Sequence, residues 1–250
     1  MNEETLDEIL NGLVRVFQKK RGYRFSIDAL LLAHFVSLHS KSKVIDLGTG
    51  SGIVPLILAQ RFPHTSWTGL EIQDRMAALA DKNVELNGLK ERVSIVHGDA
   101  RKARIIFPAH SFDAVTCNPP YRKINSGRVN PSEEKAIARH EIEGSLKDFL
   151  QAAKYLLKPG GRFFAIYPAK RLVELVSLFR AGSMEPKRMK LVFTNETSNA
   201  VFVLAEGRRG SREELKVEPS LFIYDQDKKY TRQMNDIFSD LAGAASGGDG

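Results

Sequence analysis

The sequence has a single cysteine, Cys117, among its 250 residues. One cysteine can form neither an internal disulfide nor a cysteine-rich metal site, which suits a reducing cytoplasm. No apolar run approaches the roughly 20 residues that a membrane-spanning helix needs. The acidic start, residues 1–4, also lacks the basic and then apolar pattern of a signal peptide. These absences argue against disulfide-rich secreted classes and membrane proteins, and they predict a cytoplasmic protein.

What the chain does have is an excess of positive charge. Lysine and arginine number 37 against 30 acidic residues, so the formal net charge is +7. This balance slightly favours a polyanionic partner such as nucleic acid, although solvated surface charges are the simpler explanation for any single cluster. Hydrophobic residues make up 42% of the chain, enough for the core of one α/β domain. The basic clusters are Lys19–Arg24, Arg122–Arg128, Lys187–Lys190 and Arg208–Arg212.

The first 40 residues predict a small extension made of a helix, a hairpin and a second helix. Thr5–Leu13 is the first candidate helix, and Val14–Phe17 with Tyr23–Phe25 are the candidate hairpin strands. Ala29–Leu38 is the second helix. We expect this extension, residues 1–40, to pack on the main domain.

From residue 41 the pattern changes to strands that alternate with helices. Such alternation predicts right-handed crossovers and a doubly wound, mostly parallel sheet covered on both faces. The last two apolar runs, Lys190–Phe193 and Ala200–Ala205, are close enough in sequence to pair, which predicts an antiparallel strand near the end. Leu221–Tyr224 and Tyr230–Met234 are the candidate strands of a further hairpin around 225–227. We therefore place the main α/β domain at 41–240 and a disordered tail at 241–250, where small and polar residues cannot pack. The core strands are expected at 44–47, 66–72, 93–97, 112–117 and 162–167, and the helices between them at 53–61, 74–87, 146–157 and 170–181.

A glycine-rich turn follows the first core strand directly. It reads Asp46-Leu-Gly48-Thr49-Gly50-Ser-Gly52 and opens a helix, so its backbone can approach a ligand closely. The spacing is D-x-G-x-G-x-G, which differs from the G-x-G-x-x-G of dinucleotide-binding folds because Ile53 stands where the third glycine would be. It resembles the first motif of class I methyltransferases, which bind S-adenosylmethionine.

Two further acids end the next two strands. Glu71 lies 19 residues beyond Gly52, where a carboxylate can accept hydrogen bonds from both ribose hydroxyls. Asp99 follows the third strand, and in the methyltransferases that this motif resembles such an acid contacts the adenine amine of the cofactor. Local alternatives exist, since Glu71 can favour the next helix dipole and Asp99 can cap a short helix. Three acids at one sheet edge favour the cofactor interpretation.

The tetrapeptide Asn118-Pro119-Pro120-Tyr121 follows the fourth strand. The Asn118 side-chain oxygen and the Pro119 carbonyl form a rigid acceptor pair, because proline restricts the backbone. Such a pair can orient a planar amine and favour its pyramidal form as a methyl group arrives, while Tyr121 stacks on the target base. This chemistry requires neither a metal nor a covalent nucleophile. The plainer alternative is a proline-rich turn with Tyr121 packed on the surface.

With these motifs in view, the chain resembles the bacterial tRNA1(Val) adenine-N6 methyltransferases over about residues 14–235. Beyond the glycine turn, the resemblance rests on Gln18–Leu32, on Asn118–Tyr121 and on 126–141. It implies S-adenosylmethionine as cofactor, with Asn118 beside it, and an adenine of tRNA next to the anticodon as substrate. It also implies that Phe25 and Asp28 line the methionine end of the cofactor, although a packed aromatic and a first-turn acid are the alternatives. The oligomeric state stays open.

Other functions compete with this interpretation. Glutamine-amide methyltransferases that act on release factors, and enzymes that methylate guanine amines of ribosomal RNA, also carry Asn-Pro-Pro-Tyr motifs. A nucleotide-dependent oxidoreductase is disfavoured by the glycine spacing. A non-catalytic RNA-binding module on the same fold is disfavoured by the intact motifs, since fold alone does not determine function.

Overall fold

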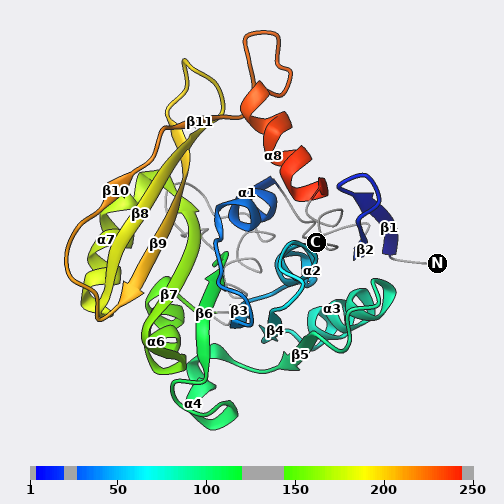
Figure 1. Ribbon diagram of the computed structural model, residues 1–250, viewed down its shortest axis with the longest axis vertical. Coiled ribbons are helices and arrows are strands. Elements are labelled where there is room, and N and C mark those ends of the chain that lie inside the picture. The colour runs from blue at the N-terminus through cyan, green and yellow to red at the C-terminus, as the bar shows by residue number, and fades with distance from the viewer. Residues whose placement is uncertain (1–3, 20–26, 120–143, 244–250) are drawn as a thin grey trace, which may run out of the picture.

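The computed structural model describes residues 4–19, 27–119 and 144–243, and nine strands of these segments form one twisted sheet (Figure 1). The sheet order is β10-β8-β9-β7-β6-β3-β4-β5, with β11 also beside β8. β9 runs antiparallel to both β7 and β8, whereas β3–β7 are parallel to one another. The predicted doubly wound sheet with its late antiparallel strand is confirmed. The strands are β3 (Lys43–Leu47), β4 (Ser66–Glu71), β5 (Val93–His97), β6 (Phe112–Cys117), β7 (Leu157–Pro168), β8 (Met184–Phe193), β9 (Ala200–Arg209), β10 (Lys216–Val217) and β11 (Leu221–Phe222).

Helices cover both faces of this sheet. On one face α1, α2, α3 and α8 bury apolar side chains in a shared core, and on the other face α4, α6 and α7 do the same (Figure 1). Short 3₁₀ turns, η1 and η2, precede α4 and α7. The bounds are α1 (Ile27–Phe35), α2 (Ile53–Arg61), α3 (Asp74–Leu86), η1 (Ala100–Lys102), α4 (Ala103–Ile106), α6 (Leu146–Leu156), η2 (Ala169–Arg171), α7 (Leu172–Ala181) and α8 (Arg232–Gly243).

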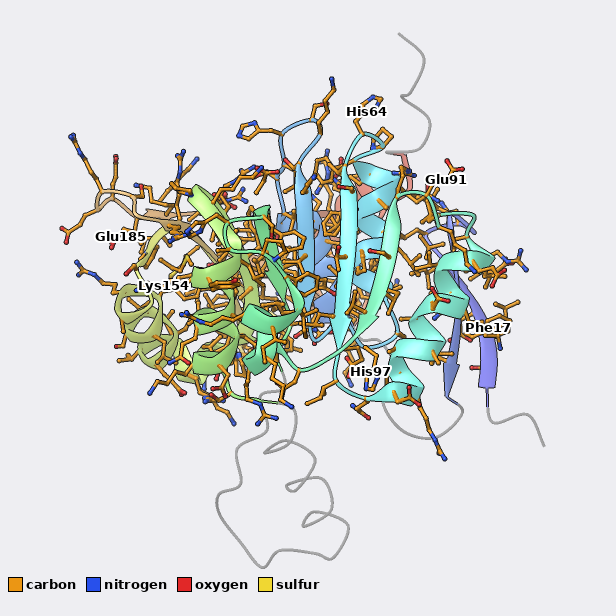
Figure 2. All side chains as sticks on the ribbon, turned by 90° about the horizontal axis from the view of Figure 1, so that it is seen from below. Phe17, His64, Glu91, His97, Lys154 and Glu185 are labelled. Carbon is orange, nitrogen blue, oxygen red and sulfur yellow. The ribbon has the colours of Figure 1, made fainter. Side chains whose placement is uncertain are left out.

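Different residues lie at the amino and carboxyl edges of the parallel sheet. His64 and Glu91, which precede β4 and β5, lie at the amino edge, and His97 at the end of β5 lies at the opposite, carboxyl edge (Figure 2). The glycine turn, Glu71 and Asn118 follow the carboxyl ends of β3, β4 and β6. The motifs predicted to act together are therefore at one edge.

The predicted first helix, Thr5–Leu13, is wrong. This segment contains β1 (Glu4–Ile9), which pairs antiparallel with β2 (Val14–Lys19). The turn uses Asn11 and Gly12 with φ of 57° and 83°, and Asn-Gly is a strong hairpin signal because both residues adopt this conformation readily. The hairpin therefore closes at residues 10–13 rather than around 19–22, and Tyr23–Phe25 lies outside the described residues.

The C-terminal prediction also needs correction. Tyr224 and Tyr230 do form an antiparallel bridge, but Tyr230–Met234 does not continue as a strand because α8 begins at Arg232. Thr231 caps that helix by accepting the Met234 N–H at 3.2 Å. Leu241 is buried, so the domain boundary moves from 240 to the end of α8, and residues 244–250 lie outside the description.

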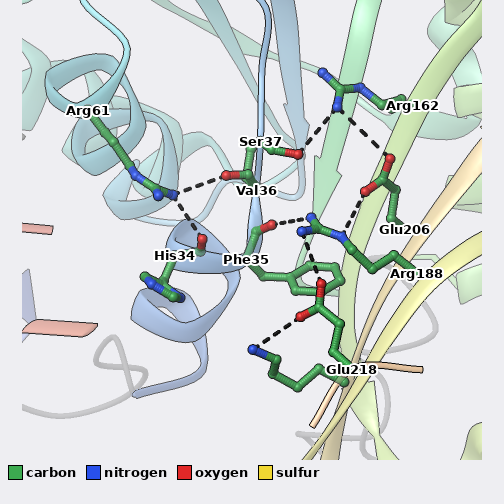
Figure 3. A network of polar contacts seen from close by, with 10 residues as sticks. His34, Phe35, Val36, Ser37, Arg61, Arg162, Arg188, Glu206 and Glu218 are labelled. Carbon is green, nitrogen blue, oxygen red and sulfur yellow. Dashed lines mark hydrogen bonds and ion pairs between the residues drawn. The ribbon is translucent and has the colours of Figure 1, made fainter. Parts of the chain in front are cut away.

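A network of guanidinium groups holds the carboxyl-terminal end of α1 (Figure 3). Arg61 of α2 donates to three carbonyls there, those of Ala33, His34 and Val36, at 2.9–3.0 Å. Arg188 of β8 donates to the Phe35 carbonyl at 2.6 Å. Helix ends leave carbonyls without intrahelical partners, and cations there also oppose the negative end of the helix dipole. These contacts anchor the carboxyl-terminal end of α1 to α2 and β8.

Arg188→Met is expected to lower the free energy of unfolding by about 2–4 kcal/mol. The substitution removes the guanidinium that Glu206 and Glu218 share at 3.0 and 3.4 Å, and it frees the Phe35 carbonyl. Of the ion pairs in the described chain, Glu206 then keeps only Arg162 at 4.0 Å and Glu218 only Lys190 at 3.1 Å, and weakening a poorly solvated ion cluster is costly. Arg180→Met is the matched control, because its pair with Glu213 is largely exposed and should contribute at most about 1 kcal/mol. Urea unfolding of both variants measures the difference, and equal losses would contradict the assigned role of Arg188.

Candidate active site

The glycine turn after β3 adopts a backbone conformation that residues with a Cβ atom rarely adopt. Gly48, Gly50 and Gly52 have φ of 73°, 58° and 82°, the left-handed region that favours glycine. Gly52 also packs tightly on α3, since a Cβ there would lie 3.3 Å from the Cβ of Ala80. The Gly48 N–H donates to the Leu70 carbonyl at 2.9 Å, which joins the turn to β4. The turn is therefore a preformed cradle at the start of α2.

Glu71 supports this cradle from the neighbouring strand. Its carboxylate is only 4% exposed and accepts the Gly50 N–H at 2.8 Å and the Gln73 N–H at 2.9 Å. Burial raises the pKa of Glu71, and the backbone hydrogen bonds partly offset this. The contact with Gln73 also satisfies a donor at the start of α3, so the predicted local role coexists with a position beside the glycine turn.

Asp46 lies at the centre of the site and is 2% exposed. Thr116 of β6 donates its hydroxyl to the Asp46 carboxylate at 2.7 Å. Thr49 Oγ1 is near enough to lower the pKa of Asp46, yet it is buried and makes no hydrogen bond within the described segments. Burial dominates and raises the pKa of Asp46 to about 6, with the charge of Glu71 adding to the shift.

Asp46→Asn is expected to stabilise the protein at neutral pH by up to about 3 kcal/mol, because each pKa unit is worth about 1.4 kcal/mol. The folded pKa of about 6 exceeds the ordinary value of 3.8. Between these values the folded protein keeps a proton that the unfolded chain loses, so rising pH removes stability in that window. Urea unfolding at pH 4 and pH 7.5 should show the advantage of the variant growing with pH. A pH-independent difference would rule out this ionisation as its source.

Asp99 follows β5 at the carboxyl edge, and it makes the local contacts of the alternative interpretation. Its carboxylate caps η1 by accepting the Arg101 N–H at 2.9 Å, and it pairs with the Arg101 guanidinium at 2.7 Å. Burial opposes ionisation of Asp99, yet the hydrogen bonds from Arg101 outweigh it and lower the pKa. Asp99 is thus an ionised acceptor whose present partner is Arg101.

Asn118 and Pro119 follow β6 at the same edge. The side-chain oxygen of Asn118 is buried and has no hydrogen-bond partner among residues 4–19, 27–119 and 144–243. A buried acceptor without a partner is costly, and such groups concentrate where a ligand supplies the missing donor. The thiol of Cys117, just before it, is buried with a pKa far above its ordinary value, so it is not a reactive nucleophile.

The remaining predicted residues divide into described and undescribed ones. Asp28 is 1% exposed in the first turn of α1, where its carboxylate accepts the Ala29 N–H at 2.9 Å. Phe25 and Tyr121 lie outside the described residues, as does the segment 126–141. Within the described part of the chain, no group of three or more His, Cys, Asp or Glu side chains could hold a metal ion, and no helix is long and apolar enough to cross a membrane.

Two supporting residues were missed by sequence reasoning. Thr116 pairs in register with Asp46, a relation that only the strand alignment reveals. Asn83 of α3 is fully buried and donates to the carbonyl of Ser51 in the glycine turn at 3.0 Å. An asparagine in the middle of a helix is a poor helix former, and this mismatch was the available signal.

Comparison with known proteins gives a consistent result. The methyltransferase small domain family matches residues 15–178. A tRNA1(Val) (adenine(37)-N6)-methyltransferase of Dyadobacter fermentans is 25% identical, with 85% of this chain and 87% of the relative covered. The enzyme of the same name from Histophilus somni is 29% identical, with coverage of 90% and 92%. Among solved structures, a predicted O-methyltransferase from Agrobacterium tumefaciens superposes with a TM-score of 0.69 at 23% identity, covering 86% of this chain and 96% of that one, which shows the shared fold.

Proposed function

The chain belongs to the methyltransferase small domain family, and from that premise we propose that it transfers a methyl group from S-adenosylmethionine to the exocyclic amine of an adenine in tRNA, beside the anticodon. The substrate follows the names of the relatives, which are tRNA1(Val) adenine-N6 methyltransferases. The observation that carries the chemistry is the buried Asn118 oxygen, which has no hydrogen-bond partner in the described part of the chain and follows β6 at the edge that holds the glycine turn. A tRNA substrate implies the cytoplasm as the site of action.

The residues of the carboxyl edge fit the cofactor. The glycine turn offers backbone donors and space, since a Cβ on Gly50 would meet no atom of the described residues within 4 Å. Glu71 can still accept from a ribose hydroxyl, because its two oxygens offer about four acceptor positions and the N–H groups of Gly50, Gln73 and Ile72 use at most three. Thr49 Oγ1 is buried in the same turn, close to the Asp46 carboxylate. When bound, S-adenosylmethionine supplies an electrophilic methyl group. Asp28, Asp99 and the undescribed Phe25 complete the proposed set.

The acceptor pair at Asn118 and Pro119 would act on the substrate amine. An exocyclic adenine nitrogen shares its lone pair with the ring and is a poor nucleophile. The Asn118 oxygen and the Pro119 carbonyl each accept one of its N–H groups, which aims the lone pair and favours the pyramidal nitrogen. Because these dipoles are positioned before the reaction, they need little reorganisation. Tyr121 is proposed to stack on the base.

The test is transfer of labelled methyl groups from S-adenosylmethionine to three acceptor pools: tRNA that lacks the modification, ribosomal RNA and release factor. Label recovered as N6-methyladenine in tRNA, and lost in Asn118→Ala, would establish both reaction and site. Label in ribosomal RNA or release factor would keep the chemistry and overturn the substrate. No label in any pool, with cofactor still bound, would overturn the proposed activity.

A further inference from the structure

A groove lined by basic side chains lies on the sheet face opposite α1 and α2. The groove has a volume of about 610 Å³ and runs between η1 with α4 and the helix α6. Its side chains include Arg101, Arg104, Lys154 and Arg209, with Asp148 as its acidic member. Asp148 is engaged in the capping box of α6, where it accepts the Ser145 N–H at 2.8 Å. The groove is therefore strongly biased toward positive charge.

Three of these cations have no carboxylate partner in the described chain. Arg104 lies over the Tyr155 ring, with its guanidinium carbon 5.0 Å from the ring centroid. Lys154 donates to the Ser183 hydroxyl at 3.1 Å. Arg209 donates to the Leu157 carbonyl and to His110. None of these partners carries a negative charge, so they orient the cations without neutralising them. By contrast, Arg162 and Arg188 of the sheet and Arg171 of η2 each face a carboxylate.

The groove starts beside the candidate active site. Asp148 and Phe149 stand in the first turn of α6, and a Cβ on Gly48 would lie 3.5 Å from the Phe149 ring, so this end adjoins the glycine turn. From there α6 runs toward the amino edge, where β7 begins, and reaches Arg209 at the end of antiparallel β9. An 11-residue helix extends about 16 Å, enough for more than one phosphate group.

We propose that this groove binds the phosphate backbone of the RNA next to the target base. The inference rests on the proposed function for its choice of polyanion, and on the unpaired cations for its location. Backbone contacts of this kind position a nucleic acid without reading its sequence. The cations that face the groove come from three separate elements, α4, α6 and β9, so the fold rather than one charged run assembles them.

The test measures binding directly, so that it does not depend on methyl transfer. Unmodified tRNA is titrated against the full chain and against Arg104→Gln with Lys154→Gln at several salt concentrations. We expect the double variant to bind tRNA at least about 10-fold more weakly at low salt. The magnitude of its negative slope of log K against log salt should decrease by about 1–2, because each lost phosphate contact removes the release of close to one counterion. Affinity for S-adenosylmethionine and the thermal midpoint should be unchanged.

The matched control is Lys41→Gln with Lys90→Gln, which removes the same charge from exposed positions at the amino edge, before β3 and β5. Equal loss in both double variants would overturn the groove assignment and leave only net charge. Failure of the parent to bind tRNA would overturn it as well, and equal affinity for polyglutamate would point to an acidic protein partner instead. If the parent binds tRNA through these residues but transfers no methyl group, the groove stands and the proposed activity fails.

Discussion

Asn118→Ala is expected to lower kcat for methyl transfer by about 10²–10³-fold while leaving the free energy of unfolding unchanged or slightly higher. The loss of rate follows from removing a preorganised dipole, for which losses of this size are typical. The unchanged stability follows from the site itself, because the Asn118 oxygen has no hydrogen bond to lose within the described residues. Deleting a buried acceptor without a partner removes a desolvation cost.

The measurement pairs steady-state kinetics with urea unfolding on the same samples. Asn87→Ala is the matched control, because that amide accepts the Arg15 N–H at 2.9 Å and donates to the Arg15 carbonyl at 2.6 Å, away from the reacting edge. It should lose stability and keep kcat, the reverse of Asn118→Ala. If Asn118→Ala instead destabilised the fold and kept its rate, Asn118 would be a structural residue.

Much of the sheet was predictable because residues close in sequence determine where its strands and helices begin and end. The strands 93–97 and 112–117 and the helix 53–61 agree with the structure residue for residue. In each case an apolar run meets a change in polarity, a glycine or a proline. The order and direction of strands also followed, since crossovers through helices enforce parallel pairing. The helix prediction for Thr5–Leu13 failed because Asn11-Gly12 favours a hairpin turn, and this short-range signal decides the segment.

The site was predictable in its positions but not in its contacts. Asp46, Glu71, Asp99 and Asn118 could be placed at one edge, because carboxyl ends of parallel strands share that edge. Their partners depend on register and on packing between distant segments. Thr116 meets Asp46 from a strand 70 residues away, and the Arg101 guanidinium engages Asp99 in a way that no spacing indicates. The buried apolar residues of α8, Met234, Ile237 and Leu241, repeat at helical intervals. The helix was nevertheless missed, because the turn residues just before it favoured a hairpin.

Asn83 has a low helix propensity, yet it lies within α3 because its side chain makes tertiary hydrogen bonds. Its side chain is 0% exposed and uses three hydrogen bonds. The oxygen accepts the Phe17 N–H at 2.7 Å, and the nitrogen donates to the carbonyls of Phe17 and Ser51 at 3.1 and 3.0 Å. In this way one amide pairs with the free edge of β2 and holds the glycine turn. The N-terminal hairpin is thus tied to the glycine turn through α3.

Asn83→Leu is accordingly expected to lower the free energy of unfolding by about 3–5 kcal/mol and to weaken binding of S-adenosylmethionine at least about 10-fold. The stability loss reflects buried backbone groups left without partners, at about 1–3 kcal/mol each. The binding loss reflects the freed Ser51 carbonyl, which lets the turn depart from its cradle conformation. Asn87→Leu, one helical turn later, also releases β2 but does not touch the glycine turn. It should cost stability and spare the cofactor. Calorimetric titration at a temperature where both variants are folded separates the two effects, and equal cofactor affinity in both would show that Asn83 supports the fold alone.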